Sequence, residues 1–193
     1  MFPAGRPTDD SDQTAALAQS LIANRGLNEE DLFNRLRVIL YEHKSPLWEG
    51  RAVGAGKTTR NALRPTTYAE SKARPMEAEY PSNGSVMRSA PLALFFGSEN
   101  APTGDVPKRM ALVTHRHRMS FIYTYLYVRF LTIILDGNDP IERIHEFKKL
   151  SEHEPVDPGA WPERGSASLT TRIGFWAYRN AADFRDGLTL VAR

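Results

Sequence analysis

The sequence predicts an all-α fold from three observations. Apolar residues recur at the three- and four-residue spacing of amphipathic helices in several segments. Residues that favour helix starts and stops flank these segments. No segment predicts a strand strongly, and no internal repeat is visible. With 193 residues, of which 41% are hydrophobic and 25% charged, the chain suits one globular domain over residues 1–193.

The first part of the chain predicts two helices. One spans residues 12–24, has Asp10 or Ser11 as its N-terminal cap, and ends at a glycine. The other starts at Asn28, carries three acidic residues in its first turn, where the helix dipole favours them, and fades near His43. Both have an apolar stripe and should pack against a core.

The middle of the chain alternates between loops and helices. Residues 50–63 are rich in glycine and then favour a helix, whereas residues 64–81 hold three prolines and many charges and predict a surface loop. Residues 83–96 predict a turn and then an apolar helix, in which Pro91 must either form a kink or lie in the first turn. Residues 97–107 predict another loop.

The C-terminal part contains the longest apolar segment, residues 119–135. Its alternating tyrosines resemble a strand pattern, but its length favours a central buried helix. Asp139-Pro140 is a helix start, with a cap followed by proline at the first helical position, and that helix should run to about Leu150. The remaining segments predict a loop over 151–166 and helices over 168–180 and 183–193.

Composition excludes several classes of function. Lys+Arg number 25 and Asp+Glu 23, so a net charge of +2 gives no reason to expect nucleic acid or an anionic membrane as a partner. Cysteine is absent, which excludes disulfides, cysteine-ligated zinc and a cysteine nucleophile, and fits a cytoplasmic protein. The N-terminus has no apolar targeting segment, and Arg129 in the middle of residues 119–135 argues against a membrane span.

The segment Thr8-Asp9-Asp10-Ser11-Asp12 carries the clearest chemical signal. Adjacent carboxylates and a hydroxyl are hard oxygen ligands suited to magnesium or manganese. The alternative is that these residues only cap the helix that follows.

Three further motifs are weaker. Residues 51–58 end like the phosphate-binding loop of nucleoside triphosphatases. They lack the first glycine of that loop and no predicted strand precedes them, so this class of enzyme is excluded. Residues 82–88 place small residues at a helix start, which suits an anion, although a simple turn is commoner. In Thr114-His115-Arg116-His117, the two histidines do not share a helix face, and a basic surface turn is the simplest interpretation.

Taken together, these motifs resemble one family. Thr8-Asp9-Asp10-Ser11-Asp12-Gln13, then Asn83 to Pro91, then Thr114-His115 are similar, in this order, to signatures of the ADP-ribosylglycohydrolases, which include the dinitrogenase reductase-activating glycohydrolase. Phe175-Trp176-Ala177 and the residues from Asp183 to Ala192 resemble the stretch before the family's last signature. The similarity extends over nearly the whole chain.

The resemblance implies an orthogonally packed all-α fold with a pair of divalent cations, Mg or Mn. The implied reaction hydrolyses the glycosidic bond of ADP-ribose attached to a protein side chain or a small molecule. The implied metal ligands are Thr8, Asp9 and Asp10, with Asp9 and Asp10 as the catalytic carboxylates. Asn83, Gly84, Ser85 and His115 would bind the ADP-ribose.

The sequence departs from the family pattern in three places. Pro7 stands where the family has an aromatic residue, and an upstream segment with a Gly-Asp motif is absent. The last signature, Gly-Gly-Asp-Xaa-Asp-Thr, which supplies further metal ligands, is absent as well. We therefore expect a partial domain, which is either a fragment or natural truncation of a larger enzyme, or a degenerate relative without turnover. Such a relative would bind ADP-ribose or a metal, or would serve a structural role.

Overall fold

The computed structural model describes residues 5–48, 53–74, 80–97, 104–153 and 165–192. These residues form helices and loops, and their only β-type pairing is an isolated bridge between Ser82 and Ser166. The helices in chain order are α1 (Asp9–Asn24), α2 (Glu29–Tyr41), α3 (Lys57–Leu63), α4 (Tyr68–Ala73), the 3-10 turn η1 (Asn83–Ser85), α5 (Ala90–Phe96), α6 (Asp105–Leu112), α7 (Arg118–Leu135), α8 (Pro140–Arg143), α9 (His145–Ser151), α10 (Ala167–Asn180) and α11 (Phe184–Val191). The all-α prediction is confirmed.

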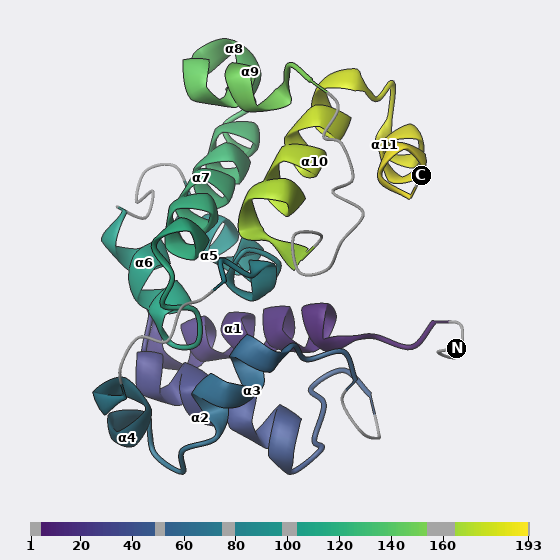
Figure 1. The fold of residues 1–193 in the computed structure, drawn as a ribbon. Helices are drawn as coiled ribbons and strands as arrows, with labels where there is room; N and C mark the ends of the chain where they lie inside the picture. Colours follow the sequence, from purple (N-terminus) through teal and green to yellow (C-terminus); the bar gives the residue numbers. More distant parts are fainter. Residues whose placement is uncertain (1–4, 49–52, 75–79, 98–103, 154–164, 193) are drawn as a thin grey trace.

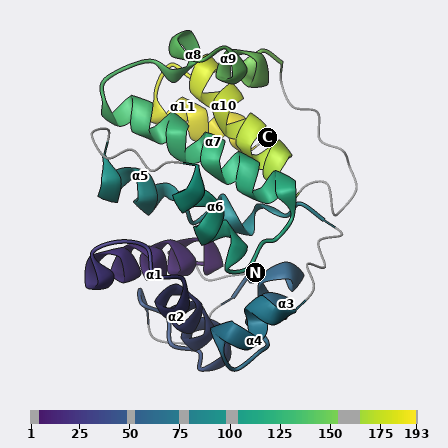
Figure 2. The same cartoon turned by 90° about the vertical axis from the view of Figure 1, so that its left-hand side faces the viewer.

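The helices form two halves with α5 and α6 between them (Figures 1 and 2). One half contains α1 to α4, and the other contains α7 to α11. α5 packs on both α1 and α7, and α6 packs on α7, so that these contacts connect the halves. None of the helices among the described residues is long and apolar enough to cross a membrane.

Two apolar clusters stabilise these halves. The larger cluster joins α1, α2, α5 and α6 around side chains such as Leu17, Phe33 and Leu92, all fully buried. The smaller one is aromatic and joins α7, α9 and α10: the ring of Phe130 stacks on Phe175 with centroids 4.1 Å apart. Because α7 contributes Val128 to the larger cluster and Phe130 to the smaller, it has the central position that residues 119–135 predicted.

Several predicted element boundaries are wrong. α1 begins at Asp9 with Thr8 as its N-cap, three residues earlier than predicted. Residues 68–73 form α4 inside the predicted loop, because Thr67 and Glu70 make a reciprocal capping box. α6 begins at Asp105, within the loop predicted over 97–107.

Two predicted continuous helices are interrupted. Residues 83–96 divide into the 3-10 turn η1 and α5. Pro91 lies in the first turn of α5, which was one of the two predictions for it, the other being a kink. The predicted helix from Pro140 to Leu150 breaks at Ile144, whose backbone is extended. In an unbroken helix Ile141 and Phe147 would lie about 120° apart around the axis, and the break allows both to reach the smaller cluster.

Candidate functional site

The predicted site residues converge on one cavity of about 590 Å³. It lies between the start of α1, the segment that enters α3, the η1 turn and the end of α6. Five residues singled out from the sequence line it: Asp9, Asp10, Asn83, Gly84 and His115. The side chains of Thr8 and Ser85, also predicted, do not line it.

The N-terminus of α1 presents the carboxylate pair. Thr8 donates a hydrogen bond from Oγ1 to Asp10 Oδ2 at 3.1 Å. Asp9 is 8% exposed, and its Oδ2 accepts a hydrogen bond from Gln13 Nε2, one helical turn along, at 3.0 Å. The peptide N–H of Asp9 donates to Val53 O at 2.9 Å, which ties α1 to the glycine-rich segment.

Gly54 explains part of the glycine content that the sequence shows before α3. Its φ is +107°, and a Cβ at this position would overlap Asp9 Oδ1. No other residue type fits there without displacing the carboxylate. The glycines of residues 51–58 therefore include one that packs on the candidate metal ligand.

The electrostatics of the pair suit a cation. Burial and, after it, the neighbouring charge of Asp10 together raise the pKa of Asp9 from 3.8 to about 6. Two carboxylates and a hydroxyl are hard oxygen donors of the kind that Mg²⁺ and Mn²⁺ prefer. Within the described part of the chain, no group of three Asp, Glu or His residues that could hold a metal ion is found.

Asp12, the third acid of the motif, has a structural role. It is fully buried and accepts a hydrogen bond from Ser45 Oγ at 2.5 Å. Ser45 Oγ in turn accepts from the backbone N–H groups of Leu47 and Trp48. Asp12 thus fixes the segment after α2 rather than lining the cavity.

The η1 turn is held from three sides. Asn83 donates from Nδ2 to Thr170 Oγ1 of α10 at 3.1 Å, and Ser82 Oγ donates to Thr58 Oγ1 of α3 at the same distance. Ser85 is fully buried and accepts a hydrogen bond from Thr124 of α7, which explains why its side chain does not reach the cavity. These anchors fix the loop at which the sequence predicts ligand binding.

His115 is buried, and its prediction as part of a surface turn is wrong. It is 1% exposed, with its ring against Gly84, where a Cβ would lie 2.7 Å from His115 Nε2. Burial, together with the charge of Arg88, lowers the pKa of His115 well below 6.5, so the ring is neutral at pH 7. Its Nδ1 is hydrogen-bonded to Thr114 Oγ1 at 2.7 Å.

The sequence analysis missed Arg88, which joins the two ends of the site. This guanidinium is fully buried. It donates from Nη1 to Gln13 Oε1 at 2.9 Å and from Nη2 to Thr114 Oγ1 at 2.7 Å. A continuous path of hydrogen bonds therefore runs from Asp9 through Gln13, Arg88 and Thr114 to His115. The sequence did contain a signal for this role: Arg88 stands among small and apolar residues, and a charge that is buried with them needs hydrogen-bonding partners.

A basic recess of about 400 Å³ adjoins the cavity. It shares the lining residues Thr58, Asn61, Tyr80 and His115 with the cavity and adds Arg64, Arg74 and Arg116. Arg116 donates to the backbone carbonyl oxygens of Ser71 and Arg74. No Asp or Glu is found among the described residues that line the recess, so its potential favours anions.

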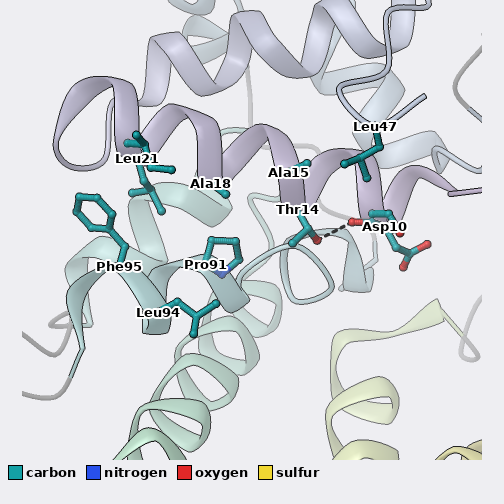
Figure 3. A pocket seen from close by; sticks show the side chains of 11 residues that line it. Asp10, Thr14, Ala15, Ala18, Leu21, Leu47, Pro91, Leu94 and Phe95 are labelled. Carbon is teal, nitrogen blue, oxygen red and sulfur yellow. Dashed lines mark hydrogen bonds between the residues drawn. The ribbon is translucent and has the colours of Figure 1, made fainter. Parts of the chain in front are cut away.

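A third hollow is apolar and lies between α1 and α5 (Figure 3). Its volume is about 650 Å³, and side chains such as Leu21, Pro91, Leu94 and Phe95 line it. Of the described residues that line it, Asp10 alone is ionisable; it lies at one end, where its backbone oxygen accepts a hydrogen bond from Thr14. Because this groove lacks the polar groups that catalysis requires, we assign the site to the first cavity.

Comparisons with known proteins test the family that these motifs resemble. The model of the ADP-ribosylglycohydrolase family matches residues 1–193. A solved structure of an ADP-ribosylglycohydrolase-related protein complex is similar at 27% identity, with a TM-score of 0.72 over 98% of this chain. The similarity covers 65% of that solved chain. None of the curated proteins matches significantly. The family match over the full chain, together with the all-α fold, shows that the protein belongs to the ADP-ribosylglycohydrolase family.

Proposed function

We propose that this chain forms the substrate-binding part of a metal-dependent hydrolase. The reaction is cleavage of the glycosidic bond that joins ADP-ribose to a protein side chain or a small molecule. One observation carries the proposal: Asp9 and Asp10 line the same cavity as Asn83, Gly84 and His115, although these residues are far apart in sequence. The family match supports a glycohydrolase, and the cavity supports this choice of residues.

Each part of the cavity has a distinct role in the proposal. Asp9 and Asp10 hold one side of a divalent-cation site for Mg²⁺ or Mn²⁺, and the third proposed ligand is Thr8, which is hydrogen-bonded to Asp10 but does not itself line the cavity. When bound, a divalent cation there would supply Lewis-acid chemistry to substrate oxygens and water. One carboxylate of the Asp9–Asp10 pair accepts the proton of the attacking water. For this step the carboxylate must face the anomeric carbon of the bound ribose.

The remaining residues bind the ADP-ribose. The η1 turn, with Asn83 and Gly84, lines the same cavity as the carboxylates and contacts the diphosphate and the neighbouring ribose. The recess with Arg74 and Arg116 adds positive potential that favours the diphosphate charge. The partner is therefore an ADP-ribosylated protein or small molecule.

A second candidate function is binding without turnover. The observation that favours it is that the described residues gather no group of three acidic or histidine side chains for a metal ion. A metal site held from one side leaves most of a six-coordinate shell to water. In that case the chain would bind ADP-ribose but release none from a substrate.

Release of ADP-ribose from an ADP-ribosylated protein, with Mg²⁺ or Mn²⁺ added, separates the two functions. A hydrolase should lose roughly 100-fold of its rate in Asp9→Asn and in Asp10→Asn, since small misplacements at a reacting centre are that costly. Asp136→Asn, an exposed acid after α7, is the matched control and should keep the wild-type rate. Binding of ADP-ribose by calorimetry without measurable release would favour the second candidate, and neither binding nor release would contradict both.

A further inference from the structure

The buried path between Arg88 and His115 determines where the histidine carries its proton. An arginine side chain donates hydrogen bonds and accepts none. The bond from Arg88 Nη2 to Thr114 Oγ1, at 2.7 Å, therefore uses an oxygen lone pair of the threonine. The hydroxyl proton of Thr114 remains to be placed.

That proton has one acceptor among the hydrogen bonds of the described residues. Thr114 is 3% exposed, and the second partner of its Oγ1 is His115 Nδ1, at 2.7 Å. If Nδ1 carried a proton, the threonine oxygen would accept from both sides, and its own proton would be buried without an acceptor. Such an orphaned buried polar group destabilises the fold. The threonine therefore donates to Nδ1, which must be unprotonated.

The other ring nitrogen, Nε2, lies beside a glycine that lines the ligand cavity. Nδ1 receives the only hydrogen bond found for the imidazole among the described side chains. Nε2 lies beside Gly84, where the absence of a side chain leaves it 2.7 Å from the position that a Cβ would take. His115 and Gly84 line the cavity together.

We propose that Arg88 and Thr114 are positioning residues that hold His115 as the neutral tautomer with its proton on Nε2, so that it donates a hydrogen bond to a ligand oxygen. A phosphate or hydroxyl oxygen fits this donor, whereas a ligand that offers only N–H groups does not. The same guanidinium sets Gln13, whose Oε1 accepts from Arg88 Nη1 so that its Nε2 donates to Asp9. Arg88 thereby orients one group on each side of the cavity.

Nitrogen-15 NMR of the ligand-free protein tests this tautomer, because protonated and unprotonated ring nitrogens have widely separated chemical shifts. His115→Asn assigns the signals among the five histidines. We expect Nδ1 in the unprotonated range and Nε2 in the protonated range at pH 7. The opposite assignment, or two protonated nitrogens, would overturn the proposal. This readout does not depend on any activity, so it stands even if the proposed function fails.

Variants test whether Thr114 and Arg88 cause the preference. Thr114→Val removes the hydroxyl at constant shape and should reduce the ratio of the two tautomers several-fold, whereas Thr114→Ser should keep it. Thr132→Val is the matched control, because this buried hydroxyl bonds only to the carbonyl oxygen of Val128 in its own helix. Arg88→Lys, which cannot reach both partners, should also reduce the ratio. An unchanged ratio in both Thr114→Val and Arg88→Lys would overturn the positioning role.

Calorimetry with ADP-ribose as the probe gives a second readout. Loss of one well-oriented hydrogen bond should weaken binding about five- to tenfold in Thr114→Val, with little change in Thr114→Ser and Thr132→Val. Equal weakening in Thr132→Val would mean that the effect is a general loss of packing, which would contradict the proposal. If wild-type protein binds no ADP-ribose, the proposed function fails, while the NMR result still decides the tautomer.

Discussion

The buried carboxylate of Asp9, a residue of the candidate site, destabilises the fold when it is ionised. Its pKa is about 6 in the folded protein and 3.8 as the reference for the unfolded chain. Between these values the folded state still holds a proton that the unfolded state has lost, so rising pH favours unfolding. Above pH 6 both states are ionised and the penalty is constant.

We therefore predict that Asp9→Asn stabilises the metal-free protein. At pH 7.5 the gain should be about 1–2 kcal/mol, discounted from the full shift because the carboxyl is partly solvated. The gain should disappear below pH 4, where Asp9 is protonated in both states. Thermal melts in a chelator across this pH range measure it. A loss of stability at pH 7.5 would show that the carboxylate is favourably paired, and Asp136→Asn serves as the control.

Gly84 permits the contact between the η1 turn and His115. A Cβ there would lie 2.6 Å from His115 Cε1, and the buried ring cannot move aside cheaply. Gly84→Ala should cost about 1–3 kcal/mol of unfolding free energy by overpacking, measured by urea denaturation. Gly56→Ala is the control in the same cavity, since nothing lies within 4 Å of a Cβ there. Equal effects of the two substitutions would contradict this account.

Some site residues could be predicted from the sequence because their chemistry is local. Asp9 and Asp10 stand next to each other at a helix start, and Asn83-Gly84 is a turn signal in any context. Arg88 could not be predicted as a bridge, since its partners are Gln13 and Thr114, at 75 and 26 residues' separation. Pairings of this kind depend on how helices pack, which local patterns do not specify.

At the level of helices, apolar spacing predicted the long elements and failed at the breaks. α2, α7 and α10 lie within one or two residues of their predicted ranges, because a long apolar stripe gives a strong helical signal. The break at Ile144 was missed, since the residues around it have helical propensity and only the contact with the aromatic cluster favours an extended backbone. The short helix α4 was missed because charges and prolines around it outweighed its capping box.

The aromatic cluster of α7, α9 and α10 offers a test at this scale. Phe175 is fully buried and contacts both Phe130 and Phe147. Phe175→Ala should cost about 3–5 kcal/mol of unfolding free energy, because it removes a ring from a packed site. Phe184→Ala is the matched control: this ring is 82% exposed, so its removal should change stability by less than about 0.5 kcal/mol. Similar losses in both variants, measured by urea denaturation, would contradict the assignment of this cluster.

Across the whole molecule, the ligand cavity forms where the two halves meet. Asp9 and Asp10 come from the half that contains α1 to α4, whereas His115 follows α6 and the η1 turn is anchored on α10. Contacts between elements distant in sequence thus create the site, and the order of the motifs along the chain gives no distances between them. The family similarity supplied the grouping that spacing alone could not.

The central claim is that one cation site on Asp9 and Asp10 faces the η1 turn and His115. Mn²⁺ is paramagnetic and broadens NMR signals of nuclei close to it, so it reports where the ion binds. Added Mn²⁺ should broaden the amide signal of Gly84 and the ring signals of His115 strongly, but not those of Phe175 in the aromatic cluster. The broadening should disappear in Asp9→Asn/Asp10→Asn and persist in Asp136→Asn. Broadening that is centred elsewhere, or that survives the double substitution, would contradict the account.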